Sequence, residues 1–449
     1  MFYSLIFYYQ DVFVSLYLRK IFEAASCNNV EFVHAALQGA YGEQKPEDLE
    51  LALIRAANNG HKVCVNLLLE HKVNVAATNG NEDTALVLAA QNGHLYIAKL
   101  LLDHGCPINH QNSMGYNALM KACENGSIEI VDMLLKHGAI DVSDDIGAEH
   151  TGKANGVSKL PQYMPHGYTS LMVTVLKQPH DYKRIAKMLL EANFNPNEVD
   201  LQDMTVLHHA ANKSTDDVIE LLIESKADAN AKDVWGVTPL MTAVAYGKVS
   251  NVQMLLKHGA DVKVTCKARR MPLSIAARTG TEDMVSTLVQ AGADLDARDA
   301  HGHTPLFIAI LHNNYEAVRC LIQSGCDLDI VCRDMTSFQM MTCFQCALHR
   351  KNVRLVEMLY QCGSFRYKDI FDALASETLK EQNSENSELI ELLKTLVLGP
   401  QSLRSSCRSV IRSICSNQQS WVDSVAKMKL PKAFQDFLLY ADLHIPVVD

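Results

Sequence analysis

The sequence predicts an all-α solenoid, a stack of short helix pairs joined by tight turns. A turn-like tripeptide recurs along the chain, with successive spacings of 33, 52, 36, 33, 33 and 33 residues. A second marker keeps the same period, because Gly259, Gly292 and Gly325 are also 33 residues apart. Repeats of about 20–50 residues are typical of solenoids, in which each unit buries its apolar face only against its neighbours. The tripeptides are Thr84–Leu86, Asn117–Leu119, Thr169–Leu171, Thr205–Leu207, Thr238–Leu240, Met271–Leu273 and Thr304–Leu306.

Residues 238–263 show one whole repeat unit. A Thr-Pro-Leu turn at Thr238 starts a short helix, a Tyr-Gly turn follows, and a second helix ends in two leucines before Gly259. This order resembles the ankyrin repeat, whose period is about 33 residues and whose signature is Thr-Pro-Leu-His-x-Ala. The resemblance covers residues 16–397 and implies an ankyrin-repeat solenoid of β-turns and helix pairs. The signature His is present only at His208, so we expect the family's Thr–His bond in that unit alone.

The repeat markers divide the chain into five segments. Residues 1–48 are expected to form an N-terminal cap with a degenerate repeat, and residues 49–145 to form regular repeats. An insertion loop at 146–165 precedes further repeats and a C-terminal cap at 166–397, and a separate segment follows at 400–442. The nine clear units lie near 49–79, 80–112, 113–145, 166–200, 201–233, 234–266, 267–299, 300–332 and 333–369.

The first twenty residues are unusually apolar, with seven aromatic residues among the first 17. They lack a basic segment at their start, and Asp11 interrupts them, so we expect a capping helix rather than a secretory signal or a membrane span. An incorrect start to the chain would produce the same composition.

Two units depart from the period. The interval of 52 residues exceeds the period by about 19, and the surplus falls at residues 146–165. That stretch contains three Gly and two Pro and has no apolar periodicity, so we expect an exposed loop. The unit at 333–369 is about five residues too long, and its turn begins at Thr342.

No catalytic, cofactor-binding or metal site is predicted. Residues 147–154 approach a phosphate-binding loop, but Ala154 stands where Ser or Thr would hold Mg²⁺, and no apolar strand precedes them. Cys343 and Cys346 have zinc-ligand spacing but lack a matched second pair, so buried thiols are expected. No nucleophile elbow, zinc-protease motif or glycine-rich nucleotide loop is present, so the chain is not predicted to be an enzyme.

Bulk composition excludes other classes of partner. The 449 residues carry a net charge of −10, which argues against nucleic acid, and no stretch is long and apolar enough to indicate a membrane partner. Thirteen cysteines follow no regular framework, which is typical of reduced thiols in the cytoplasm or also the nucleus.

Five residues are candidates for contact with a target protein. Ankyrin arrays bind proteins along a face built by turn tips and first helices, as the family resemblance implies. Trp235 precedes a glycine at a turn tip, where a small polar residue would suffice, so it is a candidate anchor. Comparable tip or helix-end positions hold Tyr116, Tyr246, His301 and His303. The alternative is that each side chain packs on a neighbouring repeat.

The C-terminal segment begins with an apolar stripe at helical spacing. Leu403, Cys407 and Ile411 are four residues apart, with Val410 beside them and Ser402 before them. This order resembles the first helix of a SOCS box, and the whole chain resembles ankyrin repeat and SOCS box proteins. The resemblance implies that these five residues bind elongin C, with elongin B behind it, as a helix in a groove.

A second stripe follows a Leu-Pro pair. Leu430, Pro431, Phe434, Phe437 and Leu438 match the position in a SOCS box that contacts a cullin carrying a RING subunit. Cullin-5 receptors usually carry Leu-Pro-aliphatic-Pro, but here the third residue is Lys and the second Pro is missing. The ankyrin context favours cullin-5, and the looser cullin-2 pattern remains the alternative.

The resemblance implies a substrate receptor of a ubiquitin ligase, which holds an unknown target protein on its repeats and recruits elongin B/C and a cullin through its tail. The alternative from another class is an ankyrin scaffold whose C-terminal helix pair only caps the array. A third hypothesis is an Mg²⁺-dependent enzyme that uses residues 147–154, but the sequence of that loop argues against it.

Overall fold

The computed structural model describes residues 20–141, 167–213, 216–334, 339–363, 367–375 and 384–398. The chain divides into two compact units, Met1–Asp228 and Ala229–Asp449, and each is described by itself. In unit 1 the helices are α2 (Ile21–Ser26), α3 (Val30–Leu37), α4 (Pro46–Asn59), α5 (Lys62–Glu70), α6 (Ala85–Gln91), α7 (Leu95–Asp103), α8 (Ala118–Asn125), α9 (Ile128–Lys136), α11 (Ser170–Lys177), α12 (Tyr182–Glu191), α13 (Val206–Asn212) and α14 (Asp216–Glu224).

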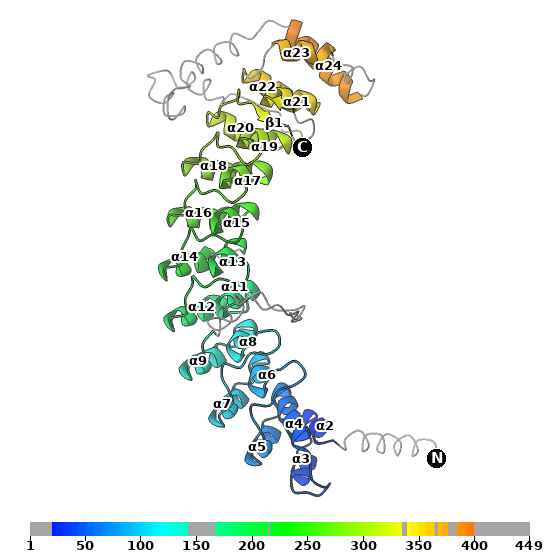
Figure 1. Ribbon diagram of the computed structural model, residues 1–449, viewed down its shortest axis with the longest axis vertical. Coiled ribbons are helices and arrows are strands. Elements are labelled where there is room, and N and C mark those ends of the chain that lie inside the picture. The colour runs from blue at the N-terminus through cyan, green and yellow to red at the C-terminus, as the bar shows by residue number, and fades with distance from the viewer. Residues whose placement is uncertain are drawn as a thin grey trace, which may run out of the picture. The chain divides into compact units, whose positions relative to one another are not determined.

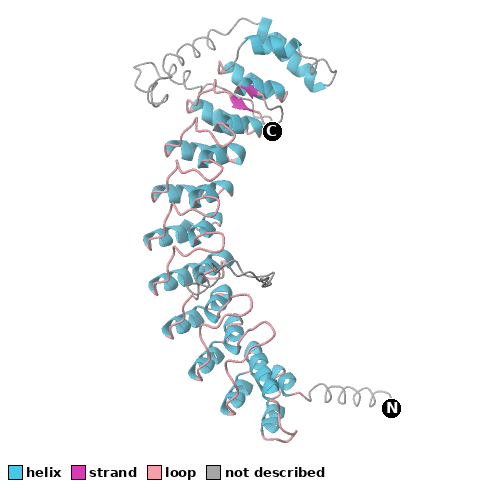
Figure 2. Cartoon of the chain, viewed as in Figure 1, coloured by secondary structure: helices cyan, strands magenta, loops and turns pink. Residues whose placement is uncertain are grey.

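Unit 2 continues the same pattern of helix pairs and ends in a longer helix (Figure 1). Among the residues that the structure describes, one short antiparallel pair of strands interrupts the helices (Figure 2). The elements are α15 (Pro239–Ala245), α16 (Val249–Lys257), α17 (Pro272–Thr279), α18 (Glu282–Gln290), α19 (Pro305–Leu311), α20 (Tyr315–Gln323), β1 (Cys332–Arg333), β2 (Met340–Met341), α21 (Cys343–His349), α22 (Val353–Gln361), α23 (Tyr367–Ala375) and α24 (Ser384–Leu398).

Within each unit, the first helices of successive pairs pack side by side. In unit 1 the order of contact is α4, α6, α8, α11 and α13, and in unit 2 it is α15, α17, α19 and α21. The leucine of each turn tripeptide is at most 1% exposed in both units, as at Leu86, Leu119 and Leu273. Such helices of seven or eight residues are too short to be stable alone, so burial between neighbours stabilises them. The predicted ankyrin-repeat solenoid is confirmed.

A buried threonine starts most first helices. The hydroxyls of Thr84, Thr169, Thr238 and Thr304 each accept a hydrogen bond from the backbone N–H three residues further on. This cap satisfies one of the four amides that a helix leaves unbonded at its start. Proline at the next position, as at Pro239, has the backbone angle that the first turn requires.

His208 makes the predicted bond with the turn. The backbone N–H of Thr205 donates to Nδ1 of His208 over 3.1 Å, which completes a capping box. A second box forms at Thr342, whose N–H donates to Oε1 of Gln345 over 2.9 Å. Gln345 therefore replaces the signature histidine in that unit, which the sequence pattern did not predict.

A five-residue turn, here called a finger, precedes these first helices. In each finger the first N–H donates to the fifth carbonyl oxygen, as from Asp233 to Val237 over 3.0 Å. The fourth residue has positive φ, for example 74° at Gly236 and 53° at Arg269. The fingers of unit 1 are residues 79–83, 112–116 and 200–204, and those of unit 2 are residues 233–237, 266–270 and 299–303.

The helix of the first regular unit begins three residues before the boundary expected between residues 48 and 49. Helix α4 begins at Pro46, so that boundary falls inside its first turn, where Glu47 and Asp48 favour the helix start. In the long unit, β1 pairs with β2 in the antiparallel direction, with Cys332 opposite Met341. The predicted N-terminal residues 1–19 and the loop at 146–165 lie outside the described residues.

Asp141 links the two sides of the insertion. Its carboxylate accepts the backbone N–H of Ser170 over 3.0 Å and the Ser170 hydroxyl over 2.5 Å. Burial raises the pKa of Asp141 to about 6, against the lowering effect of the Ser170 bonds. The charged form is therefore less favourable in the folded chain than in the unfolded chain.

Asp141→Asn is expected to change how stability depends on pH. Between about pH 4 and pH 6, the folded wild-type chain binds more protons than the unfolded chain, so its stability falls as pH rises through this window. The variant should lose that component, as urea unfolding midpoints measured from pH 4 to pH 7 would show. Asp103→Asn removes an exposed carboxylate and should keep the wild-type profile. Identical profiles for Asp141→Asn and wild type would contradict the assignment.

Candidate functional site

A groove of about 560 Å³ lies along the first helices and fingers of unit 1. Helix α4 contributes Leu51, Ile54, Arg55 and Asn58, which recur at helical spacing and therefore share one face. The remaining lining comes from α6, α8 and the first two fingers: Asn79, Asn81, Asp83, Leu88, Gln91, Asn112, Met114 and Lys121. Apolar side chains with surrounding amides and two cations suit a peptide segment better than a small uncharged ligand.

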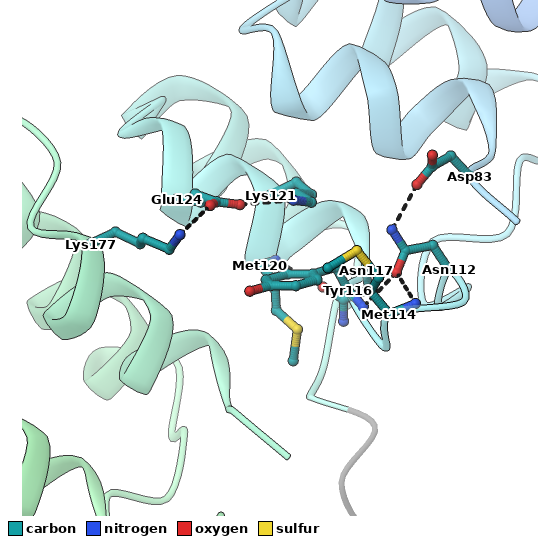
Figure 3. Close-up of polar contacts among 9 residues, drawn as sticks. All are labelled: Asp83, Asn112, Met114, Tyr116, Asn117, Met120, Lys121, Glu124 and Lys177. Carbon is teal, nitrogen blue, oxygen red and sulfur yellow. Dashed lines mark hydrogen bonds and ion pairs between the residues drawn. The ribbon is translucent and has the colours of Figure 1, made fainter. Parts of the chain in front are cut away.

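Asp83 fixes the finger wall of the groove. Its carboxylate accepts the side-chain amide of Asn112, in the next finger, over 2.7 Å, and that of Asn79 over 3.1 Å. Oδ1 of Asn112 in turn accepts the backbone N–H of Met114 and of Tyr116 (Figure 3). Because Asp83 is only 7% exposed, its carboxylate forms its hydrogen bonds within the wall and is not accessible to a partner.

Tyr116, one of the predicted target-binding residues, is a packing residue in the structure. Its ring is 8% exposed and packs with Met120 and Val173. The ammonium group of Lys121 lies 4.1 Å from the ring centroid, which holds that lysine at the groove (Figure 3). For Tyr116 the structure therefore shows the alternative, a side chain that packs on a neighbouring repeat.

Glu124 joins two lysines of successive first helices. Its carboxylate accepts Lys121 Nζ over 2.8 Å and Lys177 Nζ over 2.9 Å (Figure 3). Burial alone would raise the pKa of Glu124, but the hydrogen bonds and charges of the two lysines lower it overall. The carboxylate is therefore charged at neutral pH and neutralises part of the positive charge beside the groove.

The predicted residues of unit 2 separate into exposed and buried side chains. Trp235 is 55% exposed and Tyr246 is 59% exposed, and His301 is also exposed. His303 is only 4% exposed, its Nε2 donates to the carbonyl oxygen of Arg333 over 2.6 Å, and its ring stacks on Phe307. The expectation that His303 is available at a tip is therefore wrong, and its imidazole holds two turns together.

Met114 is a candidate contact residue that the sequence prediction missed. It lines the groove and is 43% exposed. Met114 lies three residues before the helix cap Asn117, as Trp235 and His301 lie three residues before their capping threonines. The repeat register contained this signal, but an isolated Met in a repeat is usually a core residue.

The other candidate sites are buried side chains or lie outside the described residues. Cys343 and Cys346 are buried, and among the described residues no group of three His, Cys, Asp or Glu side chains could hold a metal. In the described part of the chain, no helix combines the length and apolarity that a membrane span requires. The P-loop-like residues 147–154, the elongin residues and the cullin residues lie outside the described ranges.

The repeats match a known family. The family model described as ankyrin repeats, in three copies, matches residues 21–112, 53–146, 106–200, 171–266 and 259–334. The chain therefore belongs to the ankyrin-repeat family, whose arrays serve protein–protein interaction.

The chain is similar to solved structures, and one example is an ankyrin repeat domain. It is the human ASB11 ankyrin repeat domain, with 24% sequence identity, coverage of 54% of this chain and 98% of that chain, and a TM-score of 0.43. No curated protein matches the chain.

Leu88→Asp is expected to remove proteins that bind the groove without unfolding the repeats. The change places a charge on the partly exposed apolar floor, where a bound apolar side chain would desolvate it. Proximity labelling in cells would compare the proteins labelled by each variant. Leu95→Asp, at an exposed leucine on the second helix α7, is the matched control. Equal losses in both variants would exclude a specific role for the groove.

Proposed function

We propose that this protein is the substrate-recognition subunit of an elongin B/C–cullin–RING ubiquitin ligase. The observation that carries the proposal is the pair of motifs after the ankyrin array. Ser402, Leu403, Cys407 and Ile411 fit every position of the first SOCS-box helix, and the Leu430-Pro431 stripe follows at the expected place. An ankyrin array followed by both motifs favours a receptor over either feature alone.

The end of the array supports this proposal over a capping role for the tail. Helices α23 and α24 form a last pair, and α24 packs against α22. Leu389 and Leu393 of α24 are fully buried, and the Tyr360 hydroxyl donates to the Leu396 carbonyl oxygen over 3.3 Å. A solenoid requires a polar or covered end, and α24 covers it before residue 400. We therefore assign the apolar stripes beyond residue 400 to partners.

The mechanism is one of proximity. The ankyrin surface holds a target protein, while the tail docks elongin B/C and a cullin that carries the RING subunit and the ubiquitin-charged enzyme. Tethering raises the effective concentration of target lysines near that enzyme, and the catalytic chemistry belongs to the other subunits. We place the protein in the cytoplasm, with the nucleus as a further compartment.

Leu403→Asp and Cys407→Phe are each expected to abolish capture of elongin B/C. Aspartate would bring a charge into an apolar pocket, and phenylalanine would overfill a pocket sized for cysteine. Co-purification of the tagged full-length chain with elongin B/C measures the effect, and circular dichroism verifies that the repeats stay folded. Ser405→Asp, at a variable position of the same motif, should retain capture. Capture that survives both changes would favour the alternative, an ankyrin scaffold with a capping tail.

The choice of cullin depends on the second stripe. Cullin-5 is expected to co-purify in preference to cullin-2, and Leu430→Asp should remove the cullin while elongin B/C remains bound. The same kind of change at a linker residue between the two stripes, Val422→Asp, is the control and should keep both partners. Preferential recovery of cullin-2 would assign the chain to the looser pattern instead.

A further inference from the structure

The helical carboxylates of the four pairs from α15 to α22 in unit 2 are confined to one of the two rows of helices. The first helices α15, α17, α19 and α21 contain no Asp or Glu. The acidic residues of the same four pairs lie on the second helices, at Glu282, Asp283, Glu316 and Glu357. Figure 1 shows the first helices of this unit in one row and the second helices in another. The second helices also carry Lys257, Arg319 and Arg354, so what distinguishes the row of first helices is that it has no carboxylate to neutralise nearby cations.

The fingers of unit 2 add cations to the face of the first helices. Lys267, Arg269 and Arg270 are exposed in a single finger. The aspartates of the neighbouring fingers do not neutralise them, because Asp233 and Asp299 are buried and each accepts two backbone N–H groups of its own finger. Within the described part of the chain, neither Arg269 nor Arg270 forms an ion pair.

Backbone hydrogen bonds join the fingers into one continuous row. The N–H of Lys267 donates to the Trp235 carbonyl oxygen over 2.9 Å, and the N–H of Ala300 donates to the Ala268 carbonyl oxygen over 3.1 Å. Trp235 and His301 therefore stand on either side of the cationic finger. An exposed indole beside guanidinium groups is the composition found at the centres of protein interfaces.

A second row of polar side chains lies at the ends of the first helices. Arg278 is in the last turn of α17, and the residues that directly follow α15, α19 and α21 are Tyr246, His312 and Arg350. Burial, and then the charges of Arg278 and Arg350, lower the pKa of His312, so its imidazole is mainly neutral at neutral pH and the positive charge of this row comes from the two arginines. Between the two rows lie Ile275 and the largely buried Ile308, which occupy the register of Leu88 in the unit 1 groove.

We propose that this face of unit 2, lined by Trp235, Lys267, Arg269, Tyr246 and Arg278, binds an acidic segment of the recruited protein that also carries apolar side chains. The inference rests on the proposed receptor function and names the chemistry of its target. Carboxylates would pair with the guanidinium groups, each of which can donate two parallel hydrogen bonds. Apolar side chains would cover the isoleucines and the two exposed rings.

An acidic protein segment fits this face better than a nucleic acid does. Binding of a phosphate backbone needs cations along the whole path, but the strip between the two rows is apolar at Ile275 and Ile308. The net charge of −10 for the whole chain also opposes the long-range attraction of a polyanion. A short segment with a few carboxylates would pair with the local positive charge, and the net negative charge of the chain would repel it less than it repels a long polyanion.

The test uses the full-length chain and random twelve-residue peptides displayed on phage. Selection is expected to enrich peptides that combine Asp or Glu with Leu, Phe or Trp. Fluorescence anisotropy then measures the affinity of the most enriched peptide for the wild type and for an Arg269→Asn, Arg278→Gln double variant. Asparagine is chosen at position 269 because it tolerates the positive φ of 53° there. The double variant should bind at least tenfold more weakly.

A control variant and a competing nucleic acid distinguish the possible outcomes of this test. Lys257→Gln, in the last turn of the second helix α16, should bind as the wild type does. Enrichment of non-acidic peptides, absence of enrichment, or unchanged affinity of the double variant would overturn the inference. A twenty-nucleotide oligouridylate that binds more tightly than the peptide, and loses affinity in the double variant, would assign the face to nucleic acid instead. Elongin B/C capture, measured on the same preparations, reports separately on the proposed function.

Discussion

The packing of each short first helix between its neighbours is the interaction on which the rest of the structure depends. Helices of seven to nine residues cannot hold their backbone hydrogen bonds alone, so the buried leucines, alanines and capping threonines must act together. Stability is therefore shared along the array and is not concentrated in one central core. Because burial uses one side of each helix, the fingers and the opposite side are left for recognition.

The repeat period was sufficient to predict the fold, because a strict spacing of turn and glycine signals over many units is typical of a solenoid and of few alternative architectures. It was insufficient where one side chain determines the local outcome. Pro46 starts α4 earlier than the period suggests, and Gln345 forms a capping box without the signature histidine. The orientation of Tyr116 and His303 depends on contacts with Lys121 and Arg333, which no local pattern records. Register alone would have identified Met114 as a counterpart of Trp235.

The fingers explain how an acidic chain presents a basic surface. Asp83, Asp233 and Asp299 satisfy finger amides or neighbouring side chains, so their charges are directed inward. The finger at 266–270 begins with Cys266, where the neighbouring fingers begin with Asp233 and Asp299, so its cations have no carboxylate of their own finger beside them. Local electrostatics in this protein therefore follow the position of each residue within the repeat, and the net charge is a poor guide to any one face.

The bond between Asp141 and Ser170 has a consequence for the evolution and engineering of the array. It connects Asp141, five residues after the end of α9, directly to the first residue of α11, and α8 contacts α11 while α9 contacts α12. The number of residues between positions 141 and 170 is therefore decoupled from the stacking of the repeats. Residues can therefore be added, removed or replaced by a foreign domain at this position, while the repeats on both sides keep their packing.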